Sequence, residues 1–439
     1  MMDLGPPPRA IAAVDRAWAQ PRAALLVSTA VPDPGGTGVE RRAWQHLWCL
    51  SNLFDLDLVI QPRRRRGTIP QAVTERCSSV TLLPLVESSY FNVVPRGSTG
   101  FTLANELLRL GRRIWHPYLP ATRRAALSTL SARPDATYCA ALLFRLDTAW
   151  LAPWARARLA PGGRMVMDLD DLDSAFMRQQ AAMGRADRGL ELTLAYQTRA
   201  ASLARIERQV GRKFDWITLS SPLEVAHMRR KAGRGATLTA LPNCFDLRGT
   251  PLAPRANRDG KLRLLFVGFL GYVANSDAVS WFVREVLPLI EAEAGPVVEL
   301  TVVGRDAPAE LAALHDPPRI NLTGWLPDLE QAYATTDLAI MPIRMGSGTR
   351  IKALEAASMG RATVSTALGV AGLGFEPNRH YALGGSPAAF AQACLHLHRH
   401  PDQAAALVQR ARAHVRQDFS FASAVERLRA LVEAEGRPS

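Results

Sequence analysis

The stretch of the chain that decides the fold is residues 337–366, which reads DLAIMPIRMGSGTRIKALEAASMGRATVST. The apolar residues 338–343 predict a buried strand, and the glycines that follow predict a loop. Residues 350–358 predict a helix, which stops at a glycine before a second apolar strand from residue 362. Strand, loop, helix and strand in this order are typical of α/β proteins with a parallel sheet.

The loop between the first strand and the helix has the composition of a phosphate-binding loop. It consists of Gly346, Ser347, Gly348 and Thr349. Bare backbone amides at a helix N-terminus, with the cations Arg350 and Lys352 beside them, suit a diphosphate. Glu355 shares a helix face with Lys352 and suits the hydroxyls of a sugar. These residues predict a nucleotide site, and the alternative is an ordinary strand-to-helix turn with an exposed ion pair.

The chain of 439 residues is too long for one core, so two large domains or three small ones are expected. A first strand–loop–helix–strand series starts at residue 23, and a second series starts at residue 262. Residues 246–260 contain proline, glycine and scattered charges without an apolar period, which is typical of a linker. We expect Rossmann-like domains over residues 1–245 and 261–415. Ligands would lie beyond the carboxyl ends of the strands, in a cleft that the two sheets face.

The positive charge of the chain is unevenly distributed. Residues 1–250 contain 34 Lys and Arg against 21 Asp and Glu, and residues 251–439 contain 19 of each, so the first part holds the whole formal charge of +13. Such a field attracts anionic lipid, nucleic acid or acidic substrates. Because the whole chain has only four lysines, an arginine-rich composition is the alternative explanation.

The cysteines and the apolar runs favour a particular compartment. The five cysteines are far apart and form no CxxC pair, so neither a zinc site nor a disulfide framework is predicted. Such cysteines favour a reducing compartment. No apolar run reaches the roughly 18–20 residues that a membrane-spanning helix needs. We therefore expect a cytoplasmic protein that is either soluble or held peripherally at the inner face of the cell membrane.

The segment from Gly346 to Thr366, followed by GVAGL at 369–373, resembles the donor-site signature of family 4 glycosyltransferases of the GT-B fold. Further pieces occur in the order of that family. They are LPNCFD at 241–246, LLFVG at 264–268, ANSDA at 274–278, VGR at 303–305 and LTGWLPD at 322–328. The resemblance covers about 240–435 well and 23–60 and 164–225 loosely.

The resemblance implies a donor site and assigns a role to each of its parts. Its donor-binding residues are Gly268, Arg305, Gly324, Leu326, Gly346, Ser347, Gly348, Thr349, Glu355, Gly372 and Leu373. Glu355 would bind the ribose hydroxyls, while Arg350 and Lys352 would act catalytically on the diphosphate leaving group. The amides of the glycine loop and of residues 372–373 would complete the cradle, and the turn at 324–326 with Arg305 would border the base.

Two features depart from the pattern of the family. Ser347 stands where the family often has a Glu, eight residues before the ribose Glu. The loop at 268–275 lacks the Arg and Lys that many members carry there, so Arg350 and Lys352 are expected to supply that charge.

An acidic segment, DLDDLDS at 168–174, follows an apolar strand. In the family this position often carries a His-Asp pair that faces the sugar, and here Asp170 and Asp171 occupy it. A carboxylate near the reacting carbon stabilises developing positive charge or accepts a proton, so both are candidate catalytic residues. The alternatives are turn and N-cap chemistry, or the carboxylate metal motif of the other glycosyltransferase fold.

A second glycine loop precedes a helix near the start of the chain. Gly35, Gly36 and Thr37 are followed by Arg41 and Arg42, which predicts an acceptor or phosphate loop. A plain glycine turn is the alternative.

The resemblance implies retaining transfer of a sugar from a nucleotide-diphosphate sugar to a hydroxyl acceptor, without a metal or a cofactor. The expected partners are a nucleotide sugar, a glycan or polyprenyl-linked acceptor and an anionic membrane surface, but no nucleic acid. The expected role is bacterial exopolysaccharide, capsule or O-antigen assembly. The family also implies that a final helix, about 416–439, crosses back to the N-terminal domain.

Two alternatives to glycosyl transfer stay open. One is a nucleotide-sugar epimerase or a sugar phosphorylase on the same fold. The other is a non-catalytic GT-B binding subunit of a polysaccharide complex, for which Ser347 in place of Glu is the best support.

Overall fold

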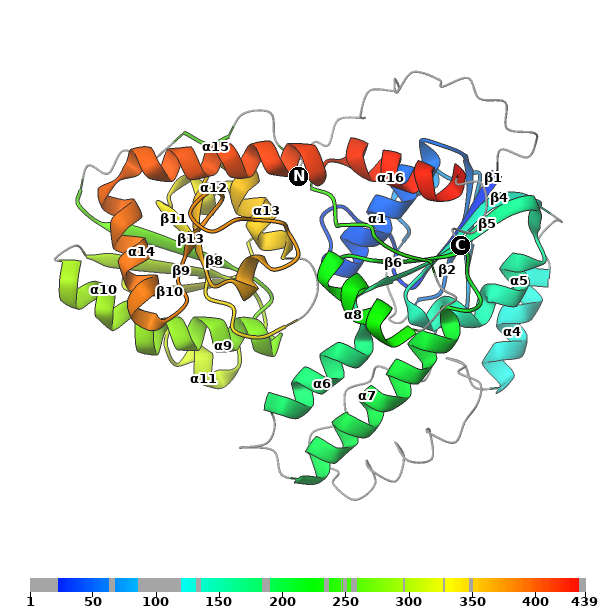
Figure 1. Cartoon of the computed structure of the whole chain (residues 1–439), viewed down its shortest axis with the longest axis horizontal. Helices are drawn as coiled ribbons and strands as arrows, with labels where there is room; N and C mark the ends of the chain where they lie inside the picture. Colours follow the sequence, from blue (N-terminus) through cyan, green and yellow to red (C-terminus); the bar gives the residue numbers. More distant parts are fainter. Residues whose placement is uncertain are drawn as a thin grey trace. The chain divides into compact units, whose positions relative to one another are not determined.

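The computed structural model describes residues 23–62, 68–85, 120–131, 136–183, 190–232, 237–245, 247, 251–253, 259–294, 297–326, 328–346 and 350–433. They fall into two compact units (Figure 1). The C-terminal unit is Phe245–Ser420, and the N-terminal unit comprises the described residues up to Cys244 together with the segment that starts at Phe421. Each unit is built on one parallel sheet, so the predicted α/β fold with two Rossmann-like domains is confirmed.

The N-terminal unit has a seven-stranded sheet in the order β3-β2-β1-β4-β5-β6-β7. The strands are β1 (Ala23–Ser28), β2 (Asp55–Ile60), β3 (Ser79–Leu82), β4 (Tyr138–Phe144), β5 (Leu159–Asp170), β6 (Trp216–Leu219) and β7 (Thr237–Ala240). Every residue of β4 is buried, which suits a central strand that is covered on both faces. Alternate residues of β1 point to opposite faces, where they join separate apolar clusters.

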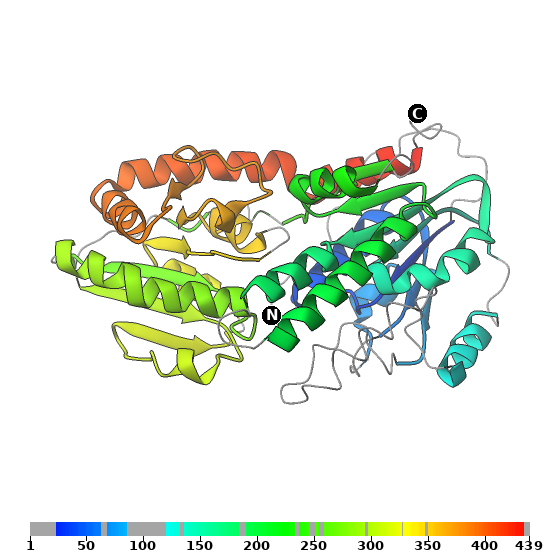
Figure 2. The same ribbon diagram turned by 60° about the horizontal axis from the view of Figure 1, so that its bottom comes forward.

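Helices cover both faces of this sheet. They are α1 (Gly38–Ser51), α2 (Gln71–Thr74), α4 (Pro120–Ser131), α5 (Ala152–Arg156), α6 (Asp173–Met183), α7 (Leu190–Val210) and α8 (Pro222–Ala232), with a 3-10 turn at Leu146–Leu151. Leu25 and Val27 of β1 pack in the cluster that includes α7, and Ala24 and Leu26 pack in the cluster of α1. Helices α6 and α7 run side by side as a hairpin (Figures 1 and 2).

The C-terminal unit has a six-stranded sheet in the order β10-β9-β8-β11-β12-β13. The strands are β8 (Leu262–Val267), β9 (Val298–Val303), β10 (Ile320–Gly324), β11 (Leu338–Met341), β12 (Ala362–Ser365) and β13 (Ala382–Leu383). Its helices are α9 (Val273–Trp281), the π-helical turn Phe282–Val286, α10 (Leu287–Ala294), α11 (Ala309–Ala312), α12 (Glu330–Ala334), α13 (Ile351–Ser358), the 3-10 turn Leu368–Val370, α14 (Pro387–Arg399) and α15 (Pro401–Asp418).

The segment 337–366 forms the predicted strand–loop–helix–strand unit. It contains β11, α13 and β12, and the two strands are parallel neighbours in the sheet. All residues of both strands are buried. Their apolar sequence therefore places this unit at the centre of the C-terminal sheet.

The chain passes between the units at two places. The first is between Cys244 and Phe245, where the Phe245 amide donates to the carbonyl of Phe419 at 2.7 Å. The second is after Ser420, where α16 (Phe421–Glu433) joins the N-terminal unit. There the ring of Phe421 lies 4.9 Å from that of Trp48 on α1. The final helix therefore belongs to the N-terminal unit, as the resemblance implied, and it begins at Phe421 rather than near residue 416.

Part of the segment 246–260 packs against the C-terminal unit. Leu252 lies against the apolar cluster of Met341, and its carbonyl accepts a hydrogen bond from Arg361 Nη1 at 3.2 Å. Among the helices of the described ranges, none is both long and apolar enough to cross a membrane.

Candidate functional site

Most of the predicted donor residues lie where the strands of the C-terminal sheet end. Because neighbouring strands are parallel, the segments after β8, β9, β10, β11 and β12 share one edge of the sheet. Gly268 follows β8, Arg305 follows β9, Gly324 closes β10 and Gly346 lies in the loop after β11. Ser347, Gly348 and Thr349 fall outside the described residues.

Two glycines allow close packing at this edge. The Gly268 amide donates to the Val303 carbonyl at 2.9 Å, and the Gly304 amide donates to the Gly324 carbonyl at 2.9 Å. A Cβ at Gly304 would collide with the carbonyl oxygen of Gly268. A Cβ at Gly268 would lie 2.7 Å from Nζ of Lys352. The absence of side chains therefore brings the two strand ends together and leaves room for the lysine.

Lys352 extends from α13 toward the end of β8. Its Nζ donates to Oδ1 of Asn275 at 2.6 Å and lies 4.5 Å from the centroid of the Phe266 ring. Burial, together with the nearby charge of Arg350, lowers the pKa of Lys352 to about 7. The residue as a whole is still partly exposed.

Arg350 connects two loops of this edge. Its Nη2 donates to the carbonyl of Gly346 at 2.7 Å, and its Nε donates to the carbonyl of Leu368 at 3.1 Å. Gly346 has a φ of +118°, a conformation that favours glycine. Arg350 thus holds the loop after β11 against the loop after β12, in addition to placing a positive charge beside α13.

The remaining donor candidates differ in how available their side chains and amides are to a ligand. Glu355 is buried on α13. Gly372 has a φ of +83°, whereas the side chain of Leu373 is buried in an apolar cluster. The Leu373 amide already donates to the carbonyl of Val370 at 3.2 Å, which leaves it less available to a phosphate than the resemblance implied.

Aromatic side chains lie beside the region expected to border the base. The guanidinium of Arg305 lies 5.7 Å from the centroid of the Phe269 ring, and Phe269 is 47% exposed. Trp325, directly after β10, is 68% exposed, while Leu326 packs against the apolar cluster of Tyr333. Sequence reasoning did not single out the rings of Phe269 and Trp325. The sequence pattern that could have indicated them is an aromatic residue just after the end of a strand, where the chain leaves the core.

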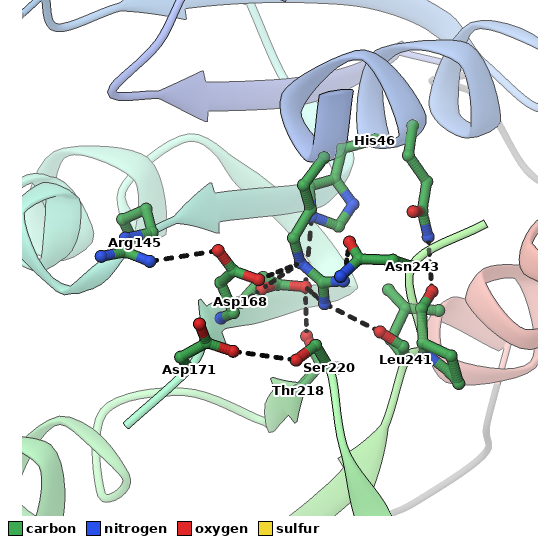
Figure 3. Close-up of polar contacts among 12 residues, drawn as sticks. His46, Arg145, Asp168, Asp171, Thr218, Ser220, Leu241 and Asn243 are labelled. Atoms are coloured by element: carbon green, nitrogen blue, oxygen red, sulfur yellow. Dashed lines mark hydrogen bonds and ion pairs between the residues drawn. The ribbon is translucent and has the colours of Figure 1, made fainter. Parts of the chain in front are cut away.

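The N-terminal unit has its own polar network at the carboxyl end of β5 (Figure 3). Nε and Nη2 of Arg42, on α1, donate to the two oxygens of Asp168 at 3.1 and 2.7 Å. Oδ2 of Asp168 also accepts from Thr218 Oγ1 at 2.8 Å and lies 3.1 Å from Nε2 of His46. Although burial opposes ionisation, Arg42 and His46 hold the pKa of Asp168 well below its usual range. The side chain of Asp168 is fully buried.

Asp170 is held by two arginines. Its Oδ1 lies 3.4 Å from Nε of Arg42, and its Oδ2 accepts from Nη1 of Arg145 at 3.1 Å. Asp170 has a φ of +65° and Arg145, which follows β4, has a φ of +75°. Two non-glycine residues thus lie in the left-handed region, at adjacent strand ends and joined by an ion pair, which makes them candidates for a functional role.

Asp171 has a different environment from Asp170. It accepts from Oγ of Ser220 at 3.0 Å, and burial together with the charge of Asp170 raises its pKa to about 7. Burial and the charge of Asp171 raise the pKa of Glu224 to about 8. Asp170 is thus paired with two arginines, whereas Asp171 and Glu224 retain protons near neutral pH.

The predicted loop at residues 35–37 is a capped turn. The amide of Gly35 donates to Oδ1 of Asp33 at 2.9 Å, and the amide of Thr37 donates to Oε2 of Glu40 at 2.7 Å. These carboxylates thus accept the hydrogen bonds of backbone amides that a phosphate would need, which favours the plain turn over an anion-binding loop. Of the two arginines expected beside this loop, Arg42 reaches the acidic segment.

Sequence reasoning missed His46, Arg145 and Asn275. Arg145 directly follows an apolar strand, which is the one local signal among them. The others come from helices and are recognised only from long-range contacts. In the described parts of the chain, no three His, Cys, Asp or Glu side chains form a group that could hold a metal ion.

Comparison with known proteins gives the class to which this fold belongs. The family model described as "Glycosyl transferases group 1" matches residues 261–400, which is most of the C-terminal unit. No curated protein matches the chain at a significant level.

Solved structures match over nearly the whole chain. Sucrose-phosphate synthase from Thermosynechococcus elongatus has a TM-score of 0.62 at 16% identity, covering 94% of this chain and 98% of that chain. TarM has a TM-score of 0.64 at 10% identity, with coverage of 94% and 99%. Anabaena HepE in complex with UDP and glucose has a TM-score of 0.58 at 13% identity, also with coverage of 94% and 99%. The chain therefore has the GT-B fold of glycosyltransferases, and its C-terminal unit carries the group 1 signature.

Proposed function

We propose that the chain transfers a sugar from a nucleoside-diphosphate sugar to a hydroxyl acceptor. The observation that carries the proposal is the partly exposed Lys352 at the glycine-lined edge of the C-terminal sheet, inside the segment that matches group 1 glycosyl transferases. HepE, which has the same fold, forms a complex with UDP and glucose. A fixed cation stabilises a diphosphate most when negative charge develops on it as the sugar leaves.

The donor would be bound by three parts of the edge. The diphosphate would bind at Lys352 and at the amides that begin α13. Glu355 would bind the ribose hydroxyls, and the base would lie near Arg305 and the exposed rings of Phe269 and Trp325. No metal ion or cofactor is required, because these side chains supply the positive charge.

On the N-terminal unit we assign Asp170 as the carboxylate that faces the sugar. It forms ion pairs with Arg42 and Arg145, and its side chain retains 10% exposure, while Asp168 is fully buried. An ionised carboxylate stabilises the positive charge that develops on the anomeric carbon. Asp171 is the weaker candidate for this role, since its raised pKa leaves it partly protonated near neutral pH. We expect retention of configuration, with the leaving diphosphate assisting the incoming hydroxyl.

For the acceptor we propose a lipid-linked glycan of a surface polysaccharide. Its support is the charge distribution, since the whole positive excess lies in residues 1–250. A basic field attracts the diphosphate of a polyprenyl carrier and an anionic membrane. This proposal makes the protein a peripheral one at the inner face of the cell membrane.

A thermal-shift screen of nucleotide sugars tests the activity first. Selective stabilisation by one donor fixes base and sugar together, and a rise in melting temperature that saturates gives the affinity. Incubation of that donor with lipid-linked acceptors, followed by mass spectrometry and NMR of the new anomeric centre, tests transfer and retention. Binding without hydrolysis or transfer would instead support a non-catalytic subunit, and acceptor-independent conversion of the sugar would support an epimerase.

A further inference from the structure

We propose that Asn275 is the positioning residue of the donor site, and that it aims Lys352 at the donor diphosphate without neutralising it. The inference rests on the proposed function and adds a residue to it. Asn275 lies in the first turn of α9 and is 7% exposed. It is 77 residues away from Lys352 in the sequence.

The orientation of the Asn275 side chain is fixed by hydrogen bonds at both ends. Its Nδ2 donates to the carbonyl oxygen of Phe269 at 2.8 Å, and its Oδ1 accepts from Nζ of Lys352 at 2.6 Å. An amide nitrogen only donates and an amide oxygen only accepts, so the carbonyl of Phe269 determines which end faces the lysine. The backbone amide of Asn275 donates to the carbonyl of Tyr272 at 2.9 Å, which anchors the residue itself.

The hydrogen-bond partner of Lys352, the amide of Asn275, is neutral. Among the described residues, no carboxylate forms an ion pair with Lys352. Glu355, on the same helix, acts on it only at longer range, and Arg350 repels it. From the other elements, Asp277 of α9 is paired with Arg344 at 2.6 Å, Arg305 lies over the Phe269 ring, and β8 contributes the uncharged Phe266.

A neutral partner leaves the lysine with a charge that a ligand can use. A carboxylate at position 275 would pair with the ammonium group and repel a diphosphate. With asparagine there, none of the described carboxylates forms an ion pair with the ammonium group, so an approaching diphosphate can pair with it and favours the protonated lysine. Since the pKa of the unliganded lysine is about 7, binding at pH 8 is expected to take up close to one proton.

The test uses the full chain and isothermal titration calorimetry with UDP, GDP, ADP and dTDP, continued with the nucleoside diphosphate that the wild type binds most tightly. Asn275→Asp is expected to weaken binding by on the order of 10-fold at pH 7, because the complex then has one positive charge less around the diphosphate. The wild-type affinity is expected to fall above pH 7 as Lys352 loses its proton. In Asn275→Asp this fall should move to higher pH by about one unit or more, because the carboxylate favours the charged lysine.

Two controls separate positioning from folding. Gln403→Glu adds the same charge at an exposed position near the start of α15 and should leave the affinity and its pH profile unchanged. Proton uptake by the wild type, measured at pH 8 in buffers of different ionisation enthalpy, requires no variant. At that pH the terminal phosphate is already ionised, so the uptake reports on the protein.

The outcomes are distinct. The role of Asn275 would be overturned if Asn275→Asp kept the affinity and the pH profile of the wild type. It would also be overturned if the wild type bound the diphosphate at pH 8 without taking up a proton. Either result could occur even if diphosphate binding itself is established. Failure of all four nucleoside diphosphates to bind the wild type would overturn the proposed function and this inference together. If Asn275→Asp does not fold, the proton uptake of the wild type decides.

Discussion

Replacing Asp168 by asparagine removes the charge at the centre of the buried network and keeps the shape of the side chain. In the wild type this carboxylate accepts two hydrogen bonds from Arg42 and one from Thr218. Removing one partner of a buried ion pair costs about 3–5 kcal/mol, because the other charge is left uncompensated. Asp170 lies 3.4 Å from Nε of Arg42 and compensates in part, which favours the lower end of that range.

The expected loss of about 3 kcal/mol corresponds to a fall of about 6–12 °C in the melting temperature of a unit of this size. Differential scanning calorimetry measures it, and Asp55→Asn, an exposed carboxylate at the start of β2 in the same unit, is the matched control. The pKa of Asp168 is lower in the folded chain than in the unfolded one. The contribution of this carboxylate to the free energy of unfolding is therefore present above the pKa that Asp168 has in the unfolded chain. It is lost as the pH falls through the pKa that Asp168 has in the folded chain.

The difference in melting temperature between wild type and Asp168→Asn should thus be constant from about pH 5 to 8 and should shrink below about pH 4. A difference under about 2 °C at pH 7 would refute the reasoning, since it would mean that Arg42 does not depend on this carboxylate. An equal loss in Asp55→Asn would refute it as well.

Three further substitutions test other parts of the structure. Lys352→Ala should lower the rate of sugar transfer by on the order of 10²-fold, measured with saturating donor, and an unchanged rate would exclude the lysine from catalysis. Asp170→Asn should lower the rate of transfer by a similar order while the dissociation constant for the nucleoside diphosphate stays within about 2-fold, so a loss confined to binding would contradict its assignment. Gly304→Ala should destabilise the C-terminal unit by about 1–3 kcal/mol, because the new Cβ meets the carbonyl of Gly268. Gly385→Ala, where a Cβ meets open space, is its control, and equal melting temperatures for the two variants would show that the strand ends can move apart.

The fold was predictable from the sequence because its elements are set by local patterns. The apolar runs of β11 and β12 flank a glycine loop and a helix, and this order alone indicates parallel neighbours. The segment expected to cross back, about 416–439, includes the end of α15, because the sequence does not show which unit a helix joins. Only the packing of Phe419 in the C-terminal unit and of Phe421 in the N-terminal unit shows where the chain passes between them.

The site was predictable only in part, because side-chain pairing is a long-range property. Lys352 stood out as a cation beside a glycine loop, yet nothing near it in the sequence indicates Asn275. Similarly, Asp168 and Arg42 are separated by 126 residues in the sequence and form their ion pair only in the folded unit. Local pattern also favoured Gly35 as a phosphate loop, whereas the nearby carboxylates of Asp33 and Glu40 bind the amides there.

The assignment of α16 to the N-terminal unit has a consequence for biosynthesis. Val425 and Leu428 of this helix are buried in the same apolar cluster as Leu26 and Leu58 of the first strands, although the ribosome makes them after the whole C-terminal unit. The N-terminal unit can therefore complete its core only after the entire C-terminal unit has been translated. A stop codon shortly before residue 421 would damage the half of the protein that is synthesised first.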